Sequence, residues 1–156
     1  MKKSILLIIL LSFNLSSYSL QDEEIVPKTV LDAFKTKYGD IKSVKWEKDK
    51  EGYEAEFKLN SKKTSAVFND LGEFIHQETQ IKTKDLPIEA DQALQNLYPG
   101  YRIDEIEKVI TASGGEFFEL EIEVGDETYE VEVNKDGKIL DLKKTSDLES
   151  KKKDSK

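Results

Sequence analysis

The chain has 156 residues, no cysteine and a formal net charge of −8 at pH 7. Without cysteine there are no disulfides, so the fold must rest on a hydrophobic core of the size that one domain provides. The negative charge argues against nucleic acid as a partner, because phosphate binding requires clustered lysine and arginine.

Residues 1–19 have the pattern of a secretory signal peptide. Lys2 and Lys3 precede an apolar run over residues 5–11, and Ser17, Tyr18 and Ser19 fit the small-x-small cleavage pattern. The apolar run is shorter than the ~20 residues that a membrane-spanning helix needs, so we expect cleavage; an uncleaved anchor is the alternative. Loss of the two lysines changes the net charge from −8 to −10. We therefore expect export to the periplasm or beyond the cell, no anchor after cleavage, and protein partners with a basic surface.

The segment 26–39 is predicted to be a helix. Pro27 suits the first turn, and Gly39 suits the end. Between them, apolar residues recur at helical spacing: Val30, Leu31, Phe34 and Tyr38. Alternation of apolar and polar residues then predicts strands over residues 41–48, 53–59, 64–68 and 73–80.

The second half repeats this order. A helix is predicted over residues 86–99, again with a proline, Pro87, near its start, and strands are predicted over 101–111, 118–124, 129–133 and after residue 137. Gly125 and Asp126 suit a two-residue hairpin turn. That turn places Ile122 opposite Tyr129, so apolar residues of the two strands share one face.

The two halves align with each other. Residues 53–75 match residues 118–140 at a constant offset of 65, and residues 26–39 match residues 86–99 at an offset of 60. Asn69 and Gly72 thereby match Asn134 and Gly137, which predicts the same turn, with a bulge beside it, before the last strand of each half. Collinear matches of this length indicate a duplication.

The predicted fold is α+β. Tandem α-β-β-β-β repeats, over about residues 25–81 and 85–143, form an antiparallel sheet of about eight strands with two helices on one face. The domain covers residues 20–144. The segment 145–156 is almost entirely charged or small, and we expect it to be disordered.

This pattern resembles the PepSY-like family, whose members are described as β-lactamase-inhibitor-like. Its markers are Trp46 in the first strand, the aromatic Tyr53 after Gly52, and the two turns that end in glycine. The resemblance covers residues 26–143, although the second half has no tryptophan. It implies a small exported bacterial protein without a catalytic motif. Related modules occur in propeptides of thermolysin-type proteases, and β-lactamase-inhibitor proteins grip an enzyme with an open sheet face.

The polar face of the second half is acidic. The hairpin register places Glu119 opposite Glu132 and Glu121 opposite Glu130, and pairs of like charge are unfavourable across strands. We interpret this face as a docking surface for a basic partner, with a divalent-cation site or a simply solvated face as alternatives. The candidate partner-binding residues of both halves are Glu54, Glu56, Lys58, Glu119, Glu121, Glu123, Glu130 and Glu132.

Catalytic chemistry has little support in the residues. His76 is the only histidine, and its position in a strand favours a partly exposed polar residue over the base of a Ser-His-Asp triad. No zinc, calcium or phosphate-binding motif is present, so we expect no metal and no cofactor. Trp46 is interpreted as a core residue beneath the first helix, with an exposed binding anchor as the alternative.

These observations predict an exported, non-enzymatic binding module that binds or inhibits another envelope or secreted protein. The alternative function is a small-ligand or divalent-cation binding protein that uses the acidic face.

Overall fold

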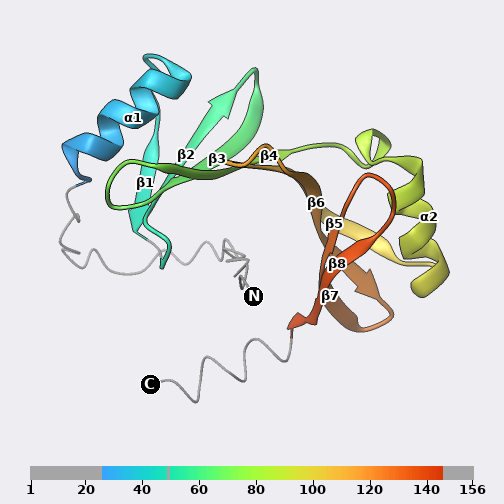
Figure 1. Ribbon diagram of the computed structural model, residues 1–156. Helices are drawn as coiled ribbons and strands as arrows, with labels where there is room; N and C mark the ends of the chain where they lie inside the picture. Colours follow the sequence, from blue (N-terminus) through green and yellow to red (C-terminus); the bar gives the residue numbers. More distant parts are fainter. Residues whose placement is uncertain (1–25, 49, 146–156) are drawn as a thin grey trace, which may run out of the picture.

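The computed structural model describes residues 26–48 and 50–145 (Figure 1). The predicted signal peptide and all but the first residue of the predicted tail lie outside these residues. A helix and four strands occur twice in succession, with a short 3-10 turn between them: α1 (Lys28–Tyr38), β1 (Lys45–Lys48), β2 (Tyr53–Leu59), β3 (Lys62–Phe68), β4 (Phe74–Gln80), η1 (Thr83–Asp85), α2 (Ile88–Leu97), β5 (Arg102–Thr111), β6 (Glu116–Val124), β7 (Glu127–Val133) and β8 (Ile139–Lys144).

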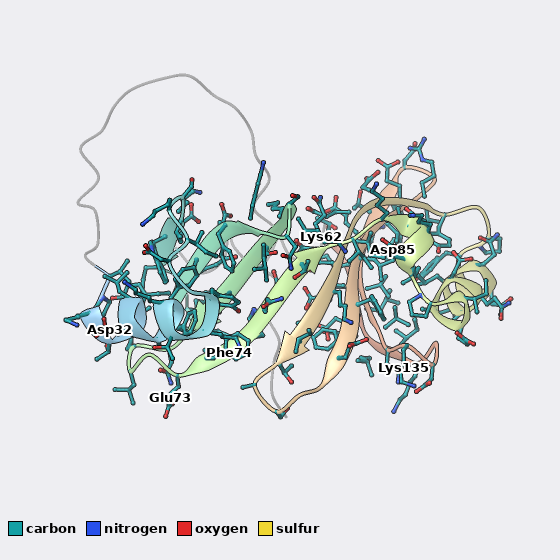
Figure 2. All side chains as sticks on the ribbon, turned by 90° about the horizontal axis from the view of Figure 1, so that it is seen from above. Asp32, Lys62, Glu73, Phe74, Asp85 and Lys135 are labelled. Carbon is teal, nitrogen blue, oxygen red and sulfur yellow. The ribbon has the colours of Figure 1, made fainter. Side chains whose placement is uncertain are left out.

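The strands form one antiparallel sheet with the order β1-β2-β3-β4-β5-β6-β7-β8, so each strand pairs with its neighbours in the chain. This confirms the predicted α+β class and the eight-stranded sheet. Figure 1 shows the sheet bent between its β1–β4 half and its β5–β8 half, with α1 and α2 near opposite ends of the outer side. Figure 2 shows the same separation of the two helices from above.

Both helices cover the same face of the sheet, as predicted. Ala66 on β3, which packs in the cluster under α1, lies beside Gln77 on β4, and Gln77 lies beside Ile110 on β5. Lys108 is two residues before Ile110 on β5 and therefore lies on the same face, and it pairs with Phe118, which packs under α2. The opposite face of the sheet is therefore left without a helix, and we call it the open face.

Each helix has its own apolar cluster. Phe34 of α1 is buried against Phe57 of β2 and Phe68 of β3, with ring centroids 5.0 and 6.3 Å away. Trp46 meets Phe34 edge to face at 5.3 Å, which confirms its interpretation as a core residue. The cluster under α2 contains Ala90 and Leu94 and the inward-facing residues of β5, β6 and β7: Ile106, Phe118, Leu120, Ile122, Val131 and Val133.

The predicted turns before β4 and β8 have the same geometry. The side-chain oxygen of Asn69 accepts hydrogen bonds from the backbone N–H groups of Leu71 and Glu73, at 3.0 and 2.9 Å. The Oδ1 of Asn134 accepts the corresponding bonds, from residues 136 and 138, at 3.0 and 2.8 Å. Both turns adjoin a register shift in the preceding strand, as predicted, and Gly72 and Gly137 both have a positive φ.

The two-residue hairpins also match their predicted registers. Ile122 pairs with Tyr129 around Gly125, and Phe57 pairs with Thr64 in the first half. Several boundaries differ from expectation by a few residues. The first strand begins at Lys45 rather than at residue 41, and both helices begin one residue after their prolines, which have extended backbones with ψ of 143° and 139°.

Candidate functional site

A row of carboxyl groups crosses the open face of the second half. Glu107 on β5 lies directly beside Glu119 on β6, Glu119 beside Glu132 on β7, and Glu132 beside Asp141 on β8. Adjacent strands are about 4.8 Å apart, so these side chains project from the sheet in close succession. We call Glu107, Glu119, Glu132 and Asp141 the acidic row.

The middle of this surface is buried, which disagrees with the alternative of a simply solvated face. The exposed fractions of Glu119, Glu130 and Glu132 are 7, 6 and 8 %. One carboxylate oxygen of each has no hydrogen-bond partner among the described residues: Oε2 of Glu119, Oε2 of Glu130 and Oε1 of Glu132. Alternation along a strand identifies the side of the sheet on which a residue lies, but it does not determine how far that residue is exposed to water.

Burial raises the pKa of these carboxyl groups. Desolvation is the main cause for Glu119, whose pKa rises to about 9, and the charges of Glu78, Glu132 and Glu107 add to it. The pKa of Glu107 rises to about 8, again mainly through desolvation and then through Glu78. The pKa values of Glu130 and Glu132 are raised for the same primary reason. At neutral pH, Glu119 and Glu107 therefore hold protons that ordinary surface carboxylates have lost.

This arrangement predicts that stability falls as the pH rises. Between the ordinary pKa of 4.5 and the folded value of about 9, folded Glu119 binds more protons than the unfolded chain, so the free energy of unfolding decreases across that window. Glu119→Gln removes the contribution of Glu119 to this dependence and should be more stable than wild type by about 2 kcal/mol at pH 9, with a smaller difference at pH 5. Urea unfolding followed by Trp46 fluorescence measures both values.

Glu89→Gln on the exposed surface of α2 is the control for that measurement. Its unfolding free energy should follow the wild-type pH dependence. Equal slopes for wild type and Glu119→Gln would contradict the assignment of a raised pKa to Glu119.

The remaining predicted partner-binding residues lie on the same open face but in more open surroundings. Glu121 pairs with Glu130 as predicted, and its pKa is raised by desolvation. Glu123 forms an ion pair with Arg102, which lowers the pKa of Glu123. In the first half, Glu56 lies 3.7 Å from Lys45, Lys58 lies opposite Lys63, and Glu54 lies opposite Val67. Whether these residues contact a partner stays a prediction.

Three acidic residues of this surface were missed by the sequence reasoning: Glu78 on β4, Glu107 on β5 and Asp141 on β8. Glu107 and Asp141 belong to the row through the pairings of β5 with β6 and of β7 with β8, and Glu78 approaches it because β4 pairs with β5, which joins the two halves of the sheet. The available signal was the alternation within residues 101–111, which places Glu105 and Glu107 on one face. The alternation alone does not show that Glu78 of the first half lies near these residues, because that depends on the pairing of β4 with β5.

His76 does not have the surroundings of a catalytic base. Its Nε2 lies 3.3 Å from Glu78 Oε1, and burial of the ring is outweighed by the neighbouring carboxylates, so the pKa of His76 is raised. The hydroxyl of Ser65 donates to the other oxygen of Glu78, at 3.2 Å. The carboxylate thus lies between the hydroxyl and the imidazole, whereas a triad needs the imidazole beside the hydroxyl.

Two further findings bear on function. Within residues 26–48 and 50–145, no group of three or more His, Cys, Asp or Glu residues has an arrangement that holds a metal ion. No helix in this part of the chain is long and apolar enough to cross a membrane.

Similar folds occur in solved structures of Bacteroides proteins. One, described as a "putative periplasmic" protein of Bacteroides eggerthii DSM 20697, has 17% identity and a TM-score of 0.73, covering 79% of this chain and 91% of that chain. A DUF2874 family protein of Bacteroides uniformis ATCC 8492 has 20% identity and a TM-score of 0.72, covering 77% and 90%. A BLIP-like protein of Bacteroides fragilis NCTC 9343 has 19% identity and a TM-score of 0.65, covering 76% and 85%. At these identities the likeness establishes the fold.

The comparison with curated proteins found no match. A family model described as "Putative beta-lactamase-inhibitor-like, PepSY-like" matches this chain twice, over residues 15–76 and 58–149. Together the two matches span both halves of the fold, in agreement with the resemblance carried by Trp46, Tyr53 and the glycine turns. The chain therefore belongs to the PepSY-like, β-lactamase-inhibitor-like family.

Proposed function

We propose that this protein is an exported, non-enzymatic module that binds another envelope or secreted protein through the open face of its sheet. The observation behind this proposal is the placement of both helices on one face, which leaves the other face without a helix and its partly exposed carboxyl groups, Glu121 and Glu123, within reach of a partner. Membership of a β-lactamase-inhibitor-like family and the likeness to a BLIP-like protein support protein binding rather than catalysis.

Export is inferred from the signal-peptide pattern of residues 1–19 and is supported by the "periplasmic" description of a structural neighbour. The partner is expected to present a basic surface. Charge complementarity of this kind steers association and selects partners. The family description further suggests that the partner is an enzyme whose activity the module inhibits.

Capture from an envelope extract, with the mature protein as bait, tests this proposal. Wild type should retain a partner that high salt releases, and the double variant Glu121→Lys/Glu123→Lys should bind it about tenfold more weakly. These positions are less buried than Glu119 and Glu130, so the fold should tolerate the charge reversal. Quantitative mass spectrometry of the retained proteins provides the measurement.

The matched control is Asp32→Lys/Asp85→Lys. It makes the same change in charge at exposed positions on α1 and η1, outside the open face (Figure 2). This control should retain the partner. Equal capture by both double variants would show that the open face is not the docking surface.

A further inference from the structure

The centre of the acidic row has unmet hydrogen-bonding capacity. Glu107, Glu119 and Glu132 lie abreast on three adjacent strands. Glu119 and Glu132 are more than nine-tenths buried, and each has one carboxylate oxygen without a hydrogen-bond partner among the described residues. Buried polar atoms in folded proteins almost always have a partner, because leaving one unpaired costs about 1–3 kcal/mol. These oxygens therefore have no donor among the described residues and can accept one from a partner.

The neighbouring cation does not fill this role. Lys143 on β8 lies 2.5 Å from Asp141 at the end of the row. Its charge lowers the pKa of Glu119, yet desolvation and the surrounding carboxylates outweigh that effect. Lys143 thus lies at one edge of the row and Lys63 acts on Glu107 at the other, while two oxygens in its interior have no partner among the described residues.

We propose that Glu107, Glu119 and Glu132 form a socket for one lysine or arginine side chain of the partner protein. This inference rests on the proposed function and specifies what the open face recognises. An ammonium or guanidinium group presents several donors at 2.7–2.9 Å, which suits carboxylates on neighbouring strands.

A metal ion fits the same residues poorly. A calcium or magnesium ion needs several oxygen ligands within about 2.0–2.6 Å. No group of three or more His, Cys, Asp or Glu among the described residues could hold such an ion.

The surroundings of the socket favour a side chain over a free cation. Val109 follows Glu107 on the open face of β5 and pairs with Phe117, which precedes Glu119 on β6. Val109 is buried and Phe117 is half-buried, so an apolar pair borders the carboxylates. The methylene stem of a lysine or arginine can lie along these residues while its charged end reaches the row.

Insertion of a cation changes the protonation of the socket. Four groups facing Glu119 act on its pKa: Glu78 of β4, Glu107 of β5, Glu132 of β7 and Lys143 of β8. The pKa of Glu107 is affected by Glu78, Glu105, Lys63 and Glu54. Because the carboxyl pKa values lie near 9 and 8, the empty socket holds protons at neutral pH, and a cation that favours the ionised form expels them.

Calorimetric titration of the mature protein with acetyl-tetralysine amide tests the socket. At pH 7.5, heats measured in phosphate and in Tris should differ by an amount corresponding to release of about one proton per peptide bound. Binding should weaken about a hundredfold between pH 8 and pH 6, because release of one proton changes the binding constant about tenfold per pH unit. Glu119→Gln, which keeps the shape of the side chain, should weaken binding at least fivefold and reduce the proton release.

Glu89→Gln on α2 is the matched control and should bind the peptide as wild type does. Equal affinity and equal proton release in wild type and Glu119→Gln would overturn the socket. Titrations with calcium chloride and with spermine complete the test. Both should bind more weakly than the peptide, and equally tight binding of either would show that the site takes free cations instead of a side chain.

The outcome separates this inference from the proposed function. If Glu121→Lys/Glu123→Lys loses the captured partner while Glu119→Gln retains it fully, the open face docks a protein and the socket is wrong. If neither variant affects capture, the docking function itself is wrong.

Discussion

Replacing Gly52 with alanine is expected to lower the free energy of unfolding by about 3–4 kcal/mol. Gly52 has a φ of 151°, a conformation that residues with a side chain rarely adopt. A Cβ atom there would lie 2.0 Å from the carbonyl oxygen of Phe68 and 2.7 Å from the Cα of Asn69. Both are backbone atoms at the end of β3, so β2 and β3 would have to separate.

Urea unfolding monitored by circular dichroism measures this loss. Gly114→Ala is the control, because Gly114 also has a positive φ, of 79°, but a Cβ atom there would meet nothing within 4 Å. The control should lose only about 1 kcal/mol, the cost of the backbone conformation alone. Similar losses in the two variants would mean that the close approach of Phe68 does not limit residue 52.

Phe34→Ala is expected to destabilise the protein by about 3–5 kcal/mol, as for other large residues removed from a packed core. Phe34 is 5% exposed, and its ring contacts those of Tyr38 and Trp46 at 5.1 and 5.3 Å, in addition to Phe57 and Phe68. Removal of the ring leaves a cavity between α1 and the sheet that these neighbours cannot fill without leaving their own contacts. The variant should unfold at lower urea concentration and shift the fluorescence of Trp46 to longer wavelength.

Leu31→Ala provides the matched control on the same helix. Leu31 is 42% exposed, so its truncation should cost less than about 1 kcal/mol and leave the Trp46 emission unchanged. If the two substitutions had the same effect, the aromatic cluster would not be the main attachment of α1 to the sheet.

The hairpins could be predicted from the sequence because local chemistry determines them. Gly125 and Asp126 select a two-residue turn, and the turn together with alternating apolar residues determines which residues of β6 and β7 lie opposite each other. The glycine turns before β4 and β8 were recognisable for a similar reason. Asn69 and Asn134 supply the oxygen that organises each loop, and the glycine supplies a positive φ.

The candidate site was only partly predictable. Glu119 and Glu132 could be paired through their two-residue hairpin, and Glu107 joins Glu119 across the longer turn between β5 and β6. Glu78 joins them only through the pairing of β4 with β5, which spans residues 81–101 and the whole of α2. The burial of these carboxyl groups also lacks a sequence signal. A period of two distinguishes the faces of a sheet, whereas the exposure of each residue depends on the assembled sheet.

The order of the strands has a consequence for how the chain acquires its structure. Each strand pairs with strands that precede or follow it directly, so the first helix and β1–β4 need no residue beyond Gln80 to complete their own apolar cluster. Short-range pairing lowers the entropy lost in closing loops and favours rapid assembly. A polypeptide that emerges N-terminus first can thus finish its leading half while the trailing half is still extended, and β4 then offers a ready template on which β5 aligns.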